Sequence, residues 1–321
     1  MIHDIFHYCA IASAVTINAF TVGIGQGLTS IAALRAVNIQ PSSNNEINKT
    51  ALFGMALIET TAVLGLFISL ILLSGPQVAI LGSFKGVTEL AIVLAICLPG
   101  LALGIASALP AQAACMAIAR QPFYAQKIMR FMMISISLIQ TPIIFGFIVS
   151  LIIHAQGSGV LYWRDALRII GSGLAIGLGS IGPAFGLGLF TQKACNALGV
   201  NRKSYEALFS YTLIRIAVIE TPLIFALVVS IMLLFLVPQA SEENLIQGIA
   251  FLCAGLTVGI GTFGAGISSA RTAASAASQI ALNPMATSSL SQTSMLGQGV
   301  IEASVIYPTI IAFFLIFFSI Q

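Results

Sequence analysis

Four long apolar runs recur along the chain, and each carries one acidic or amide residue. They are Ala51–Leu73 with Glu59, Ser135–Ile153 with Gln140, Ala217–Leu234 with Glu220, and Val300–Phe318 with Glu302. The four polar positions are 81, 80 and 82 residues apart. A period this regular indicates an internal repeat. Roughly 20 apolar residues are enough for a helix to cross a bilayer, so each run is a candidate membrane span.

Each repeat begins with a second apolar run that is rich in small residues. In the first repeat this run is Ile5–Val37, with glycine at Gly23, Gly25 and Gly27. The other repeats place Gly, Ala or Ser in the same register. Small residues let helix backbones approach closely in lipid. This pattern favours a closed circle of such helices, although ordinary packing inside a monomeric bundle uses the same residues.

We therefore predict an all-α membrane protein with eight transmembrane helices, arranged as four tandem helical hairpins that all point the same way. The predicted hairpin domains are residues 1–78, 79–157, 158–239 and 240–321. The links between hairpins are SGPQ (74–77), AQGSGVLYWRD (155–165) and PQASEEN (238–244). The first apolar run lacks the basic segment and cleavage site of a signal peptide, so we expect it to stay as the first membrane helix.

The turn inside each hairpin repeats together with the polar position. Pro41, Pro122 and Pro284 stand 18 residues before Glu59, Gln140 and Glu302. The predicted turn residues, most of them an amide side chain followed by proline, are Gln40, Pro41, Arg120, Gln121, Pro122, Asn201, Arg202, Asn283 and Pro284. Most of the lysine and arginine residues lie near these turns, whereas Lys85, Arg164 and Arg168 lie at the other end. The positive-inside rule then places the turns in the cytoplasm and both termini outside.

Composition supports the membrane assignment. Of the 321 residues, 58% are hydrophobic and only 7% are charged, with a mean hydropathy of +1.03. A soluble domain carries about 25% charged residues, which excludes that class. The net charge of +3 does not suggest a nucleic-acid partner. The pattern contains no sign of a catalytic site or of a bound cofactor, so we expect a non-catalytic protein.

The three glutamates are the chemically informative residues. A charged carboxylate at mid-membrane costs about 2.5–3.5 kcal/mol on insertion scales, and burial disfavours the ionised form. Glu59, Glu220 and Glu302 can each stay neutral by holding a proton or by coordinating a cation, as a reversible ion carrier does. A protonated glutamate that only bonds neighbouring helices is the structural alternative.

Neighbouring oxygens suggest which ion is bound. In the first repeat Gln26, Glu59 and Thr60 provide an amide, a carboxylate and a hydroxyl, a hard oxygen set that suits a small cation. Elsewhere this set is incomplete, with Thr221 after Glu220 but Ala303 after Glu302. Threonine in a helix often bonds only to its own backbone.

Arg215 lies five residues before Glu220. Its side chain can form an ion pair with that glutamate or extend toward the cytoplasmic surface. We expect it to extend toward the surface. Pro142, Pro222 and Pro308 follow the repeated polar positions by two, two and six residues, and they predict helix kinks.

These motifs resemble the c subunit of the F-type ATP synthase rotor, repeated four times. The resemblance rests on VGIGQG at Val22, ALFGMALIE ending at Glu59, ARQP ending at Pro122, IEASVIY from Ile301, and the 18-residue interval from turn proline to acid. It covers nearly the whole chain. The related V-type proteolipids, in which fused hairpins are commoner, are the close alternative.

The resemblance implies a homo-oligomeric ring in membrane lipid, with the glycine helices inside and the acid-bearing helices outside. Glu59, Glu220 and Glu302 would carry H+, or Na+ with the help of Gln26 and Thr60, past a stator a subunit. The turns would contact the central stalk, and Gln140 would carry no ion. The competing functions are a stand-alone eight-helix ion transporter and a structural membrane proteolipid.

Overall fold

A computed structural model describes residues 2–75, 84–157, 160–235 and 245–319. The described residues form ten α-helices that make up eight candidate membrane spans. The helices are α1 (Ile2–Ile39), α2 (Asn44–Ser74), α3 (Lys85–Ala106), α4 (Ala108–Arg120), α5 (Ala125–Ile139), α6 (Thr141–Gln156), α7 (Trp163–Val200), α8 (Tyr205–Phe235), α9 (Leu245–Leu282) and α10 (Thr287–Phe318). The link PQASEEN, much of SGPQ and the centre of AQGSGVLYWRD lie outside the described residues.

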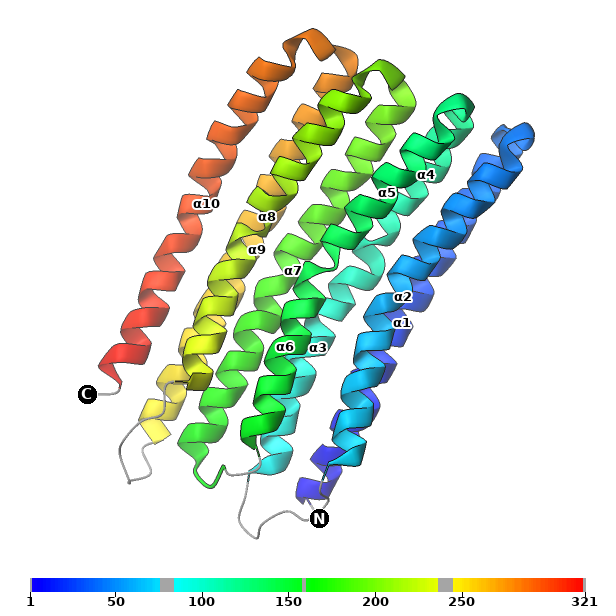
Figure 1. The fold of residues 1–321 in the computed structure, drawn as a ribbon. Coiled ribbons are helices and arrows are strands. Elements are labelled where there is room, and N and C mark those ends of the chain that lie inside the picture. The colour runs from blue at the N-terminus through cyan, green and yellow to red at the C-terminus, as the bar shows by residue number, and fades with distance from the viewer. Residues whose placement is uncertain (1, 76–83, 158–159, 236–244, 320–321) are drawn as a thin grey trace.

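The spans pair as four parallel hairpins. Each pair is joined by a 3-10 turn, at Pro41–Ser43, Pro122–Tyr124, Arg202–Ser204 and Pro284–Ala286. All four turns lie at one end of the molecule, and both termini lie near the other end (Figure 1). This arrangement confirms the predicted all-helical, four-hairpin architecture. It leaves the predicted domain bounds and the side of the membrane on which the turns lie as predictions.

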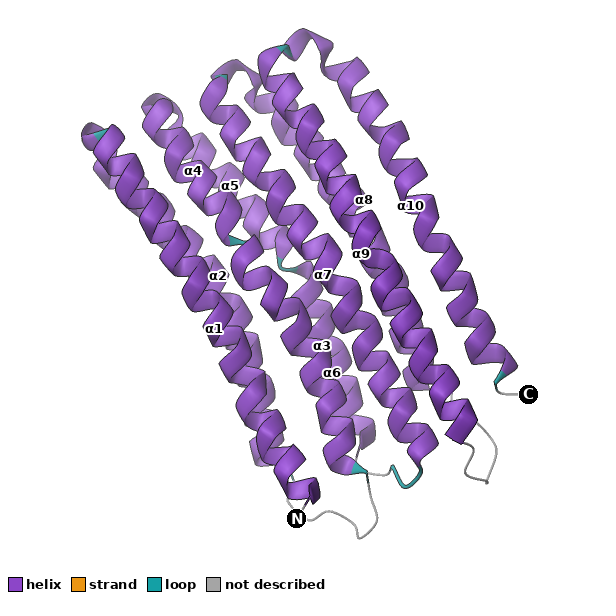
Figure 2. Cartoon of the chain, turned by 180° about the vertical axis from the view of Figure 1, so that it is seen from behind, coloured by secondary structure: helices purple, strands orange, loops and turns teal. Residues whose placement is uncertain are grey.

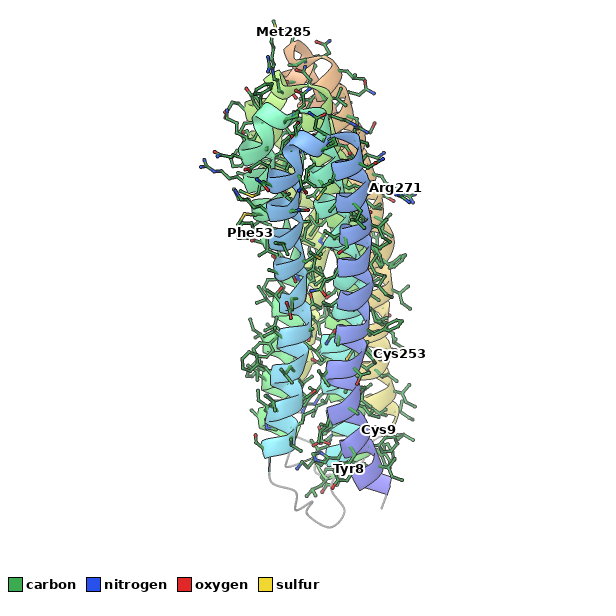
Figure 3. The ribbon with its side chains drawn as sticks, turned by 90° about the vertical axis from the view of Figure 1, so that its right-hand side faces the viewer. Tyr8, Cys9, Phe53, Cys253, Arg271 and Met285 are labelled. Carbon is green, nitrogen blue, oxygen red and sulfur yellow. The ribbon has the colours of Figure 1, made fainter. Side chains whose placement is uncertain are left out.

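The spans form two layers, seen from behind in Figure 2 and along the layers in Figure 3. One layer holds the small-residue helices α1, α3–α4, α7 and α9, and successive members pack extensively on each other. The other holds α2, α5–α6, α8 and α10, which contact one another far less. The small-residue layer is therefore the more tightly packed of the two.

The tight layer depends on direct contact between helix backbones. A Cβ atom added to Gly266 in α9 would lie 2.5 Å from the backbone nitrogen of Pro183 in α7. A Cβ atom added to Gly186 in α7 would lie 2.5 Å from the backbone oxygen of Gly266. Real Cβ atoms are not found at such distances, so both positions require glycine.

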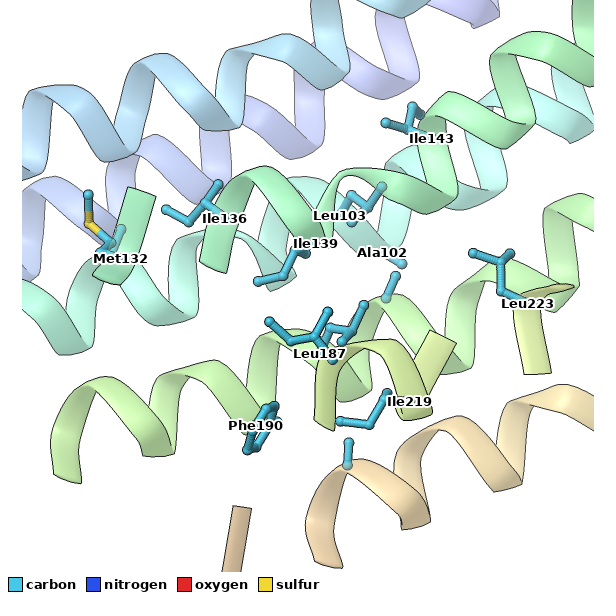
Figure 4. Packing of buried hydrophobic residues seen from close by; sticks show 14 of the residues in the cluster. Ala102, Leu103, Met132, Ile136, Ile139, Ile143, Leu187, Phe190, Ile219 and Leu223 are labelled. Atoms are coloured by element: carbon cyan, nitrogen blue, oxygen red, sulfur yellow. The ribbon is translucent and has the colours of Figure 1, made fainter. Parts of the chain in front are cut away.

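Larger apolar side chains fill the space between the two layers. Figure 4 shows Leu103, Ile139, Leu187 and Ile219 meeting there from four different helices. All four side chains are almost fully buried. This core fixes how the outer spans sit on the tight layer.

Two spans are interrupted in the second hairpin, at Ser107 between α3 and α4 and at Gln140 between α5 and α6. Pro142 follows Gln140 by two residues and cannot donate a backbone hydrogen bond. The hydroxyl of Thr141 instead donates to the oxygen of Leu138 at 2.7 Å. Pro222 and Pro308, by contrast, lie inside continuous helices. The proline alone therefore does not decide where a span breaks.

We predict that Gly266→Ala destabilises the protein by about 1–3 kcal/mol, because the new methyl group overlaps the backbone of α7. Thermal unfolding in mild detergent measures this effect. Gly264→Ala is the matched control: it makes the same change in the same helix, but its Cβ atom would meet nothing within 4 Å. Equal unfolding temperatures for the two variants would contradict the backbone-contact account.

Candidate functional site

The four repeated polar positions occupy equivalent places on the outer spans. Glu59 lies in α2, Gln140 at the α5–α6 break, Glu220 in α8 and Glu302 in α10. The residues around them differ, in part because the described chain supplies a preceding hairpin for some of the positions and not for Glu59. Gln140 shows the local geometry most fully.

Gln140 is buried and joins two hairpins. Its side-chain oxygen accepts a hydrogen bond from the hydroxyl of Thr61 at 3.2 Å. Its amide nitrogen donates to the backbone oxygen of Leu57 at 3.3 Å and to the hydroxyl of Ser107 at 3.2 Å. Thr61 and Leu57 belong to the first hairpin, whereas Ser107 lies on the small-residue layer of the second. The polar position therefore faces the outer helix of the preceding hairpin.

Glu220 repeats this relationship one hairpin later. Thr141 of the second hairpin lies beside its carboxyl group. The side chain is half-buried, and its oxygen Oε1 is buried without a hydrogen-bond partner among the described residues. Burying an oxygen of an ionised carboxylate without a partner is costly. The geometry therefore favours a neutral acid or an acid bound to a cation.

Glu302 is in a similar state. It is half-buried on α10, and its Oε1 atom is also buried without a hydrogen-bond partner in the described part of the chain. Two of the three acids thus keep one carboxylate oxygen out of solvent and unpaired. A group that must bind and release an ion needs such an unpaired oxygen.

Glu59 lies at the edge of the described double layer, on the side of the first hairpin. Its side chain is exposed. Gln26 donates to the backbone oxygen of Met55 at 3.3 Å, and Thr60 donates to the backbone oxygen of Leu57 at 2.7 Å. In the single chain these two side chains bond to the backbone of α2. The predicted Na+ set at Gln26, Glu59 and Thr60 stays a prediction.

Thr221 also bonds to its own helix, donating to the backbone oxygen of Ala217 at 3.4 Å. The position on the tight layer that matches Gln26 behaves differently in the other hairpins. Ser107 reaches Gln140, as described above, whereas Ser269 accepts a hydrogen bond from Gln298 at 2.9 Å. Each acid position therefore has different neighbours.

The expectation that Arg215 extends to the surface is wrong. Its side chain is 1% exposed. It donates to Gln298 Oε1 at 3.1 Å and to the oxygen and hydroxyl of Ser291, both at 2.9 Å. The guanidinium also lies 5.0 Å from the ring centroid of Tyr211. The physical reason is that α10 offers acceptors at the same depth, so the charge is satisfied between the third and fourth hairpins.

Sequence reasoning missed Gln298 and Ser291. The available signal was depth: Gln298 precedes Glu302 by four residues, and Arg215 precedes Glu220 by five. Polar residues at matching depth in neighbouring repeats are candidates for contact between hairpins.

The predicted turn residues lie in or directly before the short 3-10 turns, and among Gln40, Gln121, Asn201 and Asn283 only Asn201 makes a side-chain capping hydrogen bond. Pro41, Pro122 and Pro284 each occupy the first turn position, after Gln40, Gln121 and Asn283. In the third turn Asn201 accepts from the backbone nitrogen of Lys203, and it donates to the oxygen of Ala281 in the next hairpin at 2.9 Å. Arg120 and Arg202 are exposed. Phe123 and Met285, which sequence reasoning did not select, are each 95% exposed at the turn tips.

The fold and these positions define a class: an integral membrane protein of repeated hairpins with an acid or amide in each outer span. Comparison with known proteins specifies the class further. The family model for the C subunit of ATP synthase matches residues 9–72, 90–153, 170–233 and 252–315, one segment in each repeat. The chain therefore belongs to the family of ATP synthase c subunits, and it is an ion-translocating rotor component.

Individual relatives match one hairpin at a time. An ATP synthase c subunit of Dehalococcoides mccartyi is 39% identical over 71 residues, which are 22% of this chain and 93% of the relative. One from Chloroflexus aurantiacus is 36% identical over 75 residues, 23% of this chain and 99% of the relative. One from Syntrophobacter fumaroxidans is 36% identical over 70 residues, 21% of this chain and 78% of the relative. A single relative thus corresponds to about one quarter of this chain.

We predict that Arg215→Lys destabilises the chain by about 1–3 kcal/mol, because an ammonium group cannot reproduce the forked contacts to Gln298 and Ser291. Arg130→Lys, at an exposed position on α5, is the control and should change stability by less than about 0.5 kcal/mol. Thermal unfolding of both variants in detergent tests this. A stable Arg215→Lys protein would show that the buried contacts are dispensable.

Proposed function

We propose that Glu59, Glu220 and Glu302 are the ion carriers of this rotor component, and that the Gln140 position carries no ion. One observation supports this most strongly: Glu220 and Glu302 each hold a buried, unpaired carboxylate oxygen on the outer spans. A carboxylate in this setting takes a proton or a cation to cross the apolar part of the membrane. It gives the ion up when rotation brings it to an aqueous path in the stator a subunit.

Gln140 differs because an amide does not ionise and has hydrogen-bond partners on both sides. Its NH2 group donates to the backbone oxygen of Leu57 and to the hydroxyl oxygen of Ser107. In a site with a carboxylate, a bound ion would contact these same two oxygens. The amide thus replaces both the carboxylate and the ion. A ring of such chains would carry three ions for every four hairpins, which lowers the number of ions moved per turn.

The arrangement also accounts for the exposure of Glu59. Gln140 and Glu220 each contact the preceding hairpin, so Glu59 requires the α10 helix of a second copy in the ring. We propose that Gln26 and Thr60 turn toward the ion there, if the ion is Na+; H+ needs only the carboxylate. The partners are further copies of the chain, the stator a subunit and the central stalk, with no nucleic acid.

We propose further that the turns, including Arg120 and Arg202, face the cytoplasm and meet the central stalk, with both termini outside. The chain supplies no catalytic group or cofactor in this scheme. A stand-alone transporter would be expected to gather its polar groups at one midplane site. Here they are distributed one per hairpin, which favours a rotor.

Labelling with dicyclohexylcarbodiimide tests the carriers, since this reagent modifies protonated carboxyl groups in apolar surroundings. We expect label on the peptides that contain Glu59, Glu220 and Glu302. Glu46, at the polar end of α2 and partly exposed, is the internal control and should stay unmodified. Protection by Na+ would identify the ion as Na+, and protection only by raised pH would identify it as H+. Failure of all three glutamates to react at any pH would refute the carrier assignment.

A second prediction concerns the silent hairpin. Gln140→Glu should create a fourth carbodiimide-reactive carboxyl group, because Leu57, Thr61 and Ser107 are already in place as ligands. Label per chain, measured by mass spectrometry of the intact protein, should rise by about one third. Gln140→Leu is the control and should add no label. If Gln140→Glu folds and its new carboxyl group stays unreactive while Glu59, Glu220 and Glu302 react, the second hairpin lacks a further feature that a reactive carboxyl group requires.

A further inference from the structure

The helices α1 and α9 form the two edges of the tight layer in the described chain. Each leaves one side uncovered, and exposed residues recur along that side at helical spacing. On α1 they include Ile5, Cys9, Ala12, Thr16 and Phe20. On α9 they include Ile246, Ile249, Cys253 and Ile260. Each edge therefore carries a cysteine on the side that a neighbouring copy would cover.

The contact between α7 and α9 shows how one small-residue helix meets the next. A Cβ atom added to Gly171 on α7 would lie 3.2 Å from the Cα atom of Leu252 on α9. Because a carbon–carbon bond is about 1.5 Å long, the Cα atoms of these two residues lie within about 5 Å of each other. The Cα atoms of disulfide-linked cysteines are about 4.4–6.8 Å apart. Residues at these two positions are therefore close enough for a disulfide.

The register of the repeats carries this contact to the junction between two copies. The family match begins at residues 9, 90, 170 and 252 of the four repeats. Cys9 thus occupies the place of Leu252, and Cys253 occupies the place of Gly171. In a ring, α9 of one copy is followed by α1 of the next copy, just as α7 is followed by α9 within the chain. Cys253 would then meet Cys9 of the next copy where Gly171 meets Leu252.

These two thiols are also the accessible ones. Cys9 and Cys253 are exposed, whereas the other three cysteines, Cys97, Cys115 and Cys195, are buried. Figure 3 shows Cys9 and Cys253 toward the end of the molecule that lies away from the turn residue Met285. The register therefore brings together the two cysteines that are not already packed inside a single chain.

Close backbone contact is weaker at this level of the junction. Within the chain, α9 approaches α7 closely through two glycines, Gly255 and Gly259. The same register on α1 holds two larger residues, Ala12 and Thr16. Cysteine also replaces glycine at the position of Gly171. The side chains of these residues keep the two backbones farther apart, so the copies need another attachment here.

The depth of the thiols suits a disulfide. At about 1.5 Å per residue, Cys9 and Cys253 lie about 48 and 47 Å from the turn prolines Pro41 and Pro284, and the acids lie about 27 Å from theirs. If the acids mark the midplane, the thiols lie about 20 Å from it, beyond a hydrocarbon half-thickness of about 15 Å. In the orientation of the proposed function this level is outside the cytoplasm, where disulfides form and persist.

We propose that Cys253 of each copy and Cys9 of the next copy form a disulfide that joins neighbouring chains covalently. The oxidant is the disulfide of an extracytoplasmic thiol oxidoreductase. One cysteine thiolate attacks that disulfide and forms a mixed disulfide, which the second thiolate then attacks at the sulfur of the first cysteine. A bond between the two Sγ atoms replaces the S–S bond of the oxidoreductase. The oxidoreductase accepts two electrons and the two thiol protons and leaves as a dithiol. This proposal rests on the ring of the proposed function.

The test uses native membranes that contain the full chain. Free thiols are blocked with N-ethylmaleimide, and the fully denatured protein is separated by size without reductant. We expect multimers that reductant converts to single chains, and mass spectrometry should find the peptide of Cys9 linked to the peptide of Cys253. Cys9→Ser and Cys253→Ser should each decrease the multimers at least about tenfold, because each removes one of the two sulfurs.

Cys97→Ser is the matched control. It makes the same change at a buried thiol that donates to the backbone oxygen of Ser13, a contact that a hydroxyl can also make. The multimers should be unchanged in this variant. Cys9 and Cys253 both recovered with N-ethylmaleimide in the wild type would overturn the proposal, and so would multimers that persist in either Cys9→Ser or Cys253→Ser.

Imaging of the isolated assembly and carbodiimide labelling separate this proposal from the rotor assignment. A closed ring with label on Glu59, Glu220 and Glu302 but with free thiols refutes only the disulfide. A link between Cys9 and Cys253 without label on the glutamates refutes only the carrier assignment.

Discussion

The structure depends on backbone contact between small-residue helices. Lipid is as apolar as leucine, so apolar surface alone gives helices little reason to associate in a membrane. Close van der Waals contact provides that reason, and it requires glycine where α7 meets α9, at Gly186 and Gly266. The same contact draws one layer together while the bulkier outer helices stay apart.

The repeated polar residues lie where outer helices of neighbouring hairpins meet. The polar residue of one hairpin there faces the outer helix of the hairpin before it, as Gln140 meets Thr61 and Glu220 lies beside Thr141. Each of these positions therefore depends on two hairpins. In the proposed ring, a second copy of the chain would supply the neighbouring hairpin of Glu59, which is exposed in the single chain.

The repeats have also diverged within this common plan. Gln140 bonds to the first hairpin through an amide, and the same hairpin carries the two interrupted spans of the described chain. Arg215 crosses from the third hairpin to the fourth and binds Gln298, one helical turn before Glu302. Four copies in one chain allow the residues at each polar position to change separately, which a ring of identical single hairpins does not permit.

The sequence by itself determined the eight spans, their pairing into four parallel hairpins and the depth of the four polar positions. These depend on local properties: the length of apolar runs, the period of the repeat and the chemistry of the turns. Only the tertiary structure decided which side chains meet. Arg215 was expected to extend to the surface because its own repeat does not show that α10 offers acceptors at the same depth. The contacts of Gln140 likewise join residues from different repeats, and no local pattern records how neighbouring hairpins are rotated against each other.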